Sequence, residues 1–119
     1  TQQLAEQPDY WAENVYVKQF SLSGRLAHEL KSPKVVHFAT QDKMLLEKPD
    51  MIFFEQKQPD SFWRIQANKG ELFHRENRVE LMEHVLIKQH LAPNQMNQIP
   101  MNVATEALTI FPKNKTAEN

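Results

Sequence analysis

The sequence predicts an all-β domain, in the form of an open antiparallel β-jelly roll or sandwich. Apolar and polar residues alternate along most of the chain, turn residues separate these runs at short intervals, and helical periodicity is nearly absent. The 119 residues correspond to a single domain, because a chain of this length buries enough surface to fold without metal or disulfide crosslinks.

The first two predicted strands form a hairpin. Residues 15–20 and 25–31 alternate, and Ser23 and Gly24 lie between them as a turn. The chain has two glycines, and we expect both Gly24 and Gly70 to adopt positive φ.

Further short strands follow, about ten in all. Residues 51–54 are apolar on both faces, residues 63–67 alternate most clearly, and residues 71–74 make a short strand before a turn. The other strands are predicted from pairs of apolar residues at period two, which are Val79 and Leu81, Val85 and Ile87, Met101 and Val103, and Leu108 and Ile110. Residues 22–30 and 44–46 have enough helical character for a turn or two, confined by prolines.

This pattern predicts a domain over residues 9–112. Residues 1–8 are expected to be a flexible lead-in and residues 113–119 a frayed tail, since the tail is almost devoid of apolar side chains. A polar connector framed by prolines at residues 92–100 is too short to separate two domains.

Composition and charge exclude several functions. The 14 basic and 15 acidic residues are interspersed, so nucleic acid is not an expected partner. No run approaches the ~20 apolar residues that span a bilayer. The chain has no cysteine, and its serines lie at turns or strand ends without the pattern of an activated nucleophile.

No catalytic, metal-binding or cofactor-binding site is predicted. The five histidines lack the close spacing of zinc ligands, the two glycines are too isolated to cradle a phosphate, and the carboxylates fall at outward or turn positions. We therefore expect a protein that is not an enzyme and uses no metal or cofactor.

The predicted strands share an apolar inner face that has no helix to cover it. These side chains either fill the core between two sheets, or the sheets stay apart and leave a slot for a lipid chain. The predicted inner face consists of Val15, Val17, Leu26, Leu30, Leu46, Ile52, Phe54, Trp63, Ile65, Leu72, Val79, Leu81, Val85, Ile87, Val103, Leu108 and Ile110.

A series of short motifs, in order over residues 9–112, resembles the LptC family of Gram-negative lipopolysaccharide export. The motifs are Asp9-Tyr10, Ser23-Gly24-Arg25-Leu26, Leu46-Glu47-Lys48-Pro49, Phe62-Trp63-Arg64-Ile65-Gln66-Ala67 before Gly70, Arg78-Val79-Glu80-Leu81 before Val85, and Thr105, Leu108 and Pro112. No single motif is specific, but their order and intervals are.

The resemblance implies a periplasmic jelly roll at the inner membrane, anchored by an N-terminal transmembrane helix that the 119 residues do not include. It implies transfer of lipopolysaccharide from an inner-membrane ABC transporter to LptA through edge-to-edge contacts, for outer-membrane biogenesis. Family members continue with more strands after the position of Pro112, so the jelly roll is expected to be truncated at its C-terminal end.

The resemblance also suggests site residues. Gly24 matches the turn glycine between the family's first two strands. Val15 and Leu46 fall where the family's substrate-contacting inward positions lie. Together with other residues of the predicted inner face, they make up the expected lipid-binding set, which is Val15, Val17, Leu46, Ile52, Phe54, Trp63 and Ile65. The alternative function is a β-sandwich interaction module that scaffolds a membrane complex by pairing of strand edges, without binding lipid itself.

Overall fold

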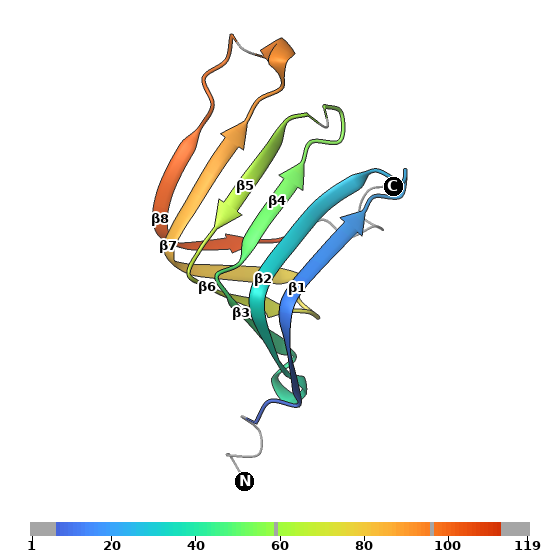
Figure 1. Ribbon diagram of the computed structural model, residues 1–119, viewed down its shortest axis with the longest axis vertical. Coiled ribbons are helices and arrows are strands. Elements are labelled where there is room, and N and C mark those ends of the chain that lie inside the picture. The colour runs from blue at the N-terminus through green and yellow to red at the C-terminus, as the bar shows by residue number, and fades with distance from the viewer. Residues whose placement is uncertain (1–6, 59, 96, 113–119) are drawn as a thin grey trace.

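The computed structural model describes residues 7–58, 60–95 and 97–112, which form an eight-stranded antiparallel sheet folded over on itself (Figure 1). The fold is the all-β jelly roll that the sequence predicts. The expected tail at 113–119 and the first six residues of the expected lead-in lie outside the described residues. The strands are β1 (Tyr10–Phe20), β2 (Leu26–Phe38), β3 (Lys43–Glu47), β4 (Asp50–Phe54), β5 (Phe62–Gln66), β6 (Lys69–Phe73), β7 (Arg78–His90) and β8 (Asn102–Ile110), with 3₁₀ turns η1 (Ala39–Gln41) and η2 (Pro93–Gln95).

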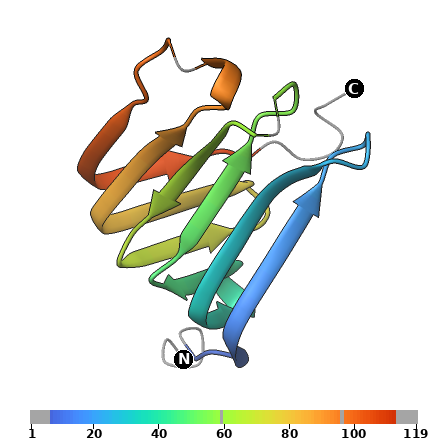
Figure 2. The same ribbon diagram turned by 45° about the horizontal axis from the view of Figure 1, so that its top comes forward.

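Two long strands divide the sheet into two layers, because each changes its partner along its length. The start of β2 pairs with β4 and its end pairs with β3. The start of β7 pairs with β6 and its end pairs with β5. We call the two parts the β4–β5 layer and the β3–β6 layer. Figure 2 shows both layers, joined where β7 and β8 bend.

The strands β1 and β8 form the two edges of the sheet. Among the described residues, β1 pairs with β2 alone and β8 pairs with β7 alone, and both edge strands run along both layers. The outer side of each edge strand therefore presents backbone N–H and C=O groups without a partner strand in the described part of the chain.

The line along which the two layers join, which we call the crease, is made by unusual backbone conformations. Asn14 in β1, Lys48 between β3 and β4, and the adjacent Glu83 and His84 in β7 all have positive φ. Pro33 lies at the equivalent point of β2. Left-handed residues and prolines interrupt regular pleating, so the sheet turns at these positions.

A ladder of hydrogen bonds holds the crease together. The amide of Lys48 donates to the carbonyl of Asn68 at 2.8 Å, and the amide of Asn68 donates to the carbonyl of Glu83 at 2.9 Å. The buried hydroxyl of Ser32 lies 2.7 Å from the carbonyl of Glu47. The linkers between short strands are thereby tied to the long strands that bend.

Several sequence predictions need correction. The chain has eight strands rather than about ten, because residues 79–87 lie in one strand, β7, that contains the bulge at Glu83 and His84, and residues 103–110 lie in β8. The residues around 44–46 form strand β3, and residues 26–30 belong to β2. In both segments cross-strand pairing overrides weak helical propensity.

The two glycines serve different purposes. Gly24 has a φ of +89°, as predicted, and its amide donates to the carbonyl of Ser21 at 2.9 Å in the turn between β1 and β2. Gly70 does not adopt positive φ, contrary to the prediction. A Cβ at Gly70 would lie 3.0 Å from Leu81 and 3.1 Å from Pro49, so this position needs glycine for packing.

Candidate functional site

The inner faces of the two layers meet at the crease and form the hydrophobic core. Its buried side chains come from both layers, and they are Met51, Ile65, Ala67, Val79, Leu81 and Val85. Leu81 and Val85 are only 1% and 0% exposed. The space between the layers is therefore filled at the crease.

A groove of about 590 Å³ opens farther from the crease. It lies among the ends of β2, β4, β5 and β8, and its lining is mostly apolar, with polar and charged groups from residues 55–57 beside it. The lining residues are Ala27, His28, Phe53, Phe54, Glu55, Gln56, Lys57, Trp63, Ile110, Phe111 and Pro112. An apolar groove beside polar groups suits an amphipathic ligand.

Three of the predicted lipid-binding residues lie on the inner face. Trp63 pairs with Phe53 across β4 and β5 and lines the groove. Ile65 is 7% exposed and belongs to the core. Leu46, 3% exposed, is buried near the crease, where it would contact a Cβ at Gly70. Trp63 is the one of the three that a ligand in the groove can reach directly.

Two of the predicted residues were assigned to the wrong face. Ile52 pairs with Arg64, and Phe54 pairs with Phe62, whereas the core-facing residues of β4 are Met51 and Phe53. Ile52 and Phe54 therefore project from the outer face, although Phe54 also reaches the rim of the groove. Since residues 51–54 are all apolar, their pattern does not show which alternate set faces inward.

The remaining predicted residues lie on the edge strand β1. Val17 pairs with Leu30, which packs against the core, so Val17 faces inward, and it is 44% exposed. Val15 pairs with the buried Ser32 near the crease. Both valines thus lie on the inner side of the sheet at its open edge.

The opposite edge of the sheet, strand β8, also exposes apolar side chains of the inner face. Val103 of β8 pairs with Ile87, which packs against the core, and Val103 is 39% exposed. Met101, just before β8, is bound through its backbone to Gln89 and is 54% exposed. Apolar inner-face side chains are therefore exposed at both edges of the sheet.

His28 and Phe53 are groove residues that the predicted lipid-binding set omitted. Their rings lie 5.4 Å apart, and burial lowers the pKa of the His28 imidazole below its ordinary value of 6.5. The position of His28 two residues before Leu30 was the signal that both side chains share one face.

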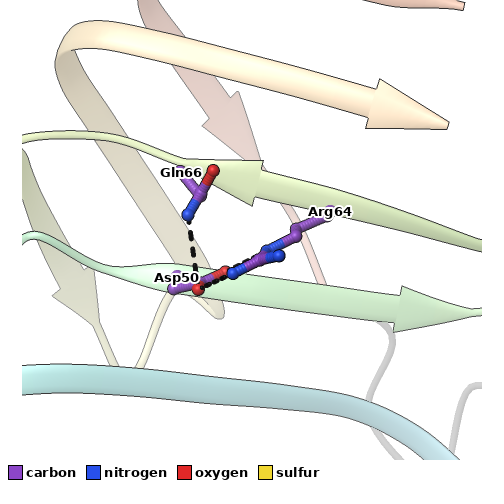
Figure 3. Close-up of polar contacts among 3 residues, drawn as sticks. All are labelled: Asp50, Arg64 and Gln66. Atoms are coloured by element: carbon purple, nitrogen blue, oxygen red, sulfur yellow. Dashed lines mark hydrogen bonds and ion pairs between the residues drawn. The ribbon is translucent and has the colours of Figure 1, made fainter.

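The outer face of the β4–β5 layer is polar at its centre (Figure 3). Arg64 donates to both carboxylate oxygens of Asp50, at 3.0 and 2.6 Å, and Gln66 lies 3.4 Å from the same carboxylate. The hydrogen bond with Asp50 raises the pKa of the Arg64 guanidinium. The same two strands thus present an ion pair outward and an apolar surface inward.

The described residues contain no group of three or more His, Cys, Asp or Glu side chains placed to hold a metal ion. Ser61, which is 0% exposed, donates to Gln95 and accepts from the amide of Ala92 at 2.9 Å. These bonds link the turn before β5 to the connector between β7 and β8, which gives this buried hydroxyl a structural role.

An all-β jelly roll with an apolar inner face is the fold expected from the sequence resemblance. The family model described as LptC, lipopolysaccharide-assembly, LptC-related, matches residues 1–119. The chain belongs to the LptC family. No individual curated protein matches it.

Membership in the LptC family assigns the protein a role in lipopolysaccharide transport, associated with the periplasm and the inner membrane. The LptC family consists of transport proteins rather than known enzymes. Within the part of the chain that the structure describes, no helix has the length and apolar character needed to cross a membrane.

Proposed function

We propose that this LptC-family protein binds the acyl chains of lipopolysaccharide between its two layers and passes them from an inner-membrane ABC transporter to LptA. The observation that carries the proposal is the groove of about 590 Å³ on the inner face, with Phe53 and Trp63 on its apolar side and Gln56 and Lys57 beside it. Phe53 and Trp63 suit the acyl chains, and Gln56 and Lys57 suit the sugars and phosphates of the headgroup.

The proposed lipid contacts come from the groove and the β1 edge. Phe53, Trp63 and His28 contact the acyl chains in the groove, and Val15 and Val17 contact them at the β1 edge. Leu46 and Ile65 form the buried floor toward the crease. Ile52 faces outward with Arg64 and does not contact the chains, and Phe54 contacts them only at the rim of the groove.

Partial enclosure suits a protein that passes its ligand on. Burial of a chain contributes ~0.8 kcal/mol per CH₂, so full burial of several chains would make release very slow. The groove is open, and the neighbouring inner-face residues Val17 and Val103 are 44% and 39% exposed. A lipid held in this way keeps part of its apolar surface uncovered.

The two edges support transfer between proteins. Unpaired backbone groups along β1 and β8 are templates for strand addition by neighbouring sheets. A neighbour that pairs at either edge would extend the inner face beyond Val17 or Val103 and continue the apolar surface. We assign the β1 edge to the transporter and the opposite, C-terminal side of the sheet to LptA.

Site-specific photo-crosslinking tests the proposal. A photoreactive side chain at Val17, Phe53 or Val103 should capture lipopolysaccharide, and one at Ile52 or Leu86 should not. Leu86 is the matched control for Val103, because Leu86 is 40% exposed and Val103 39%, while Leu86 pairs with Gln66 on the outer face. Equal capture on both faces, or capture at none of these positions, would favour the alternative of an interaction module that binds no lipid in its interior.

A further inference from the structure

One groove residue carries an ionisable group into the apolar surface. His28 lies on the inner face of β2, half-buried, with its ring 5.4 Å from that of Phe53 and tilted by 37°. Its side chain forms no hydrogen bond or ion pair with another residue in the described ranges 7–58, 60–95 and 97–112. The imidazole therefore contributes to the groove mainly as an aromatic ring.

The groups around His28 offer no compensation for a positive charge. Its cross-strand neighbours are Gln19 on β1 and Phe53 on β4, and the nearby lining from β5 and the end of β8 is Trp63 and Ile110 to Pro112. The charged residues of the groove are Glu55 and Lys57, one of each sign, and both are exposed. Glu29, next to His28 in the chain, faces outward and accepts a hydrogen bond from Tyr16.

Desolvation is accordingly the cause that lowers the pKa of His28 from its ordinary value. A ligand chain lying over the ring would remove the remaining water and disfavour the imidazolium further. A bound acyl chain therefore lowers the affinity of His28 for a proton. By thermodynamic reciprocity, protonation of His28 lowers the affinity of the groove for the chain.

We propose that His28 makes acyl-chain binding in the groove dependent on pH: the neutral ring packs against the chain, and the protonated ring displaces it. This inference rests on the proposed function, since it concerns the same groove. The expected direction follows from the charge. The affinity of the groove for an acyl chain is highest when His28 is neutral. It falls as the pH drops through the pKa of His28, by at most about tenfold per pH unit for one proton.

The other histidines provide a matched control. His90, on β7, stacks on Phe62 with ring centroids 4.5 Å apart, so it is also a strand histidine beside a phenylalanine. Its pairing with Phe62, the cross-strand neighbour of Phe54, places it on the outer face. His90→Phe therefore makes the same chemical change as His28→Phe, but at a histidine outside the groove.

The test measures binding of a nonionic alkyl glycoside, whose headgroup does not titrate, to the purified protein at about pH 7.5 and about pH 5. The wild-type protein and His90→Phe should bind more weakly at the lower pH, by up to about tenfold. His28→Phe should bind equally at both pH values. Thermal unfolding at each pH identifies any variant that is not folded, and His28→Gln replaces His28→Phe if the larger ring disturbs packing.

The outcomes separate the two proposals. Binding of the wild-type protein that is independent of pH, or a pH dependence that persists in folded His28→Phe and His28→Gln, would overturn the role of His28 and leave the groove function intact. Failure of the wild-type protein to bind the glycoside or lipopolysaccharide at either pH would overturn the groove function, and with it this inference.

Discussion

The crease and the groove are two regions of the same inner face, and they differ in how much of their apolar surface the protein itself covers. In the core at the crease, Leu81 and Val85 are 1% and 0% exposed. On the edge strand β1, Val17 is 44% exposed, and in the groove Phe111 is 67% exposed. The apolar inner face is thus packed at the crease and left uncovered at the sheet edge and in the groove.

Because of this difference, the crease contributes to folding stability and the exposed apolar surface is available for ligand binding. Apolar surface buried in the folded protein stabilises it by about 25 cal/mol per Å², and surface left in water remains for a ligand to cover. Substitutions at the crease should therefore lower the free energy of unfolding, and substitutions at the edges should change lipid binding with little effect on stability.

The largest expected effect is that of Leu81→Ala at the crease. Removing this buried side chain should lower the free energy of unfolding by about 2–5 kcal/mol, since it leaves a cavity between the two layers. Val103→Ala, also an inner-face residue but at the exposed β8 edge, should lower it by less than about 1 kcal/mol. Urea titration of both variants measures the comparison, and equal losses would contradict it.

Gly70→Ala should have the next largest effect, a loss of about 1–3 kcal/mol from overpacking. The added Cβ would lie 3.0 Å from the Leu81 side chain. In a Leu81→Ala background the same substitution should destabilise the protein less, because the side chain it meets is gone. A double-mutant cycle by urea titration gives the coupling. Additive effects would show that the Gly70 position is limited by something other than Leu81.

Local patterns in the sequence predicted most strands and turns, but they did not predict the crease. The hairpin around Gly24 followed from alternation and a turn residue, and it was predicted correctly. The strand β7 was predicted as two strands because a charged residue, Glu83, lies between Leu81 and Val85 at the position where period two requires an apolar one. The structure has a bulge at Glu83 and His84, and the hydrogen bond from the Asn68 amide to the Glu83 carbonyl joins residues too distant in the sequence for a local pattern to show.

The groove was predicted less completely than the fold. The inner face of β5 followed from the clear alternation around Trp63 and Ile65. The inner face of β4 did not, because residues 51–54 are apolar throughout and only the pairing with β5 separates Phe53 from Phe54. The requirement for glycine at position 70 also depends on residues distant in the sequence, Leu81 and Pro49.

The smallest expected effect concerns the outer face of the same two strands, at the Asp50–Arg64 ion pair. Arg64→Gln removes a guanidinium that lies 2.6 Å from the Asp50 carboxylate, but the Arg64 side chain is 42% exposed. Ion pairs that water reaches contribute about 0–1 kcal/mol, so the loss of stability should fall in that range and shrink further at high salt.

The same variant tests whether the outer face takes part in ligand binding. Because Arg64 faces away from the groove, lipopolysaccharide capture by a photoreactive side chain at Phe53 should be unchanged in Arg64→Gln. Urea titration at low and high salt, together with crosslinking yield, measures both effects. A folded Arg64→Gln protein that no longer captures lipopolysaccharide at Phe53 would mean that the two faces of β4 and β5 are not separate, and that ligand binding extends to the outer face.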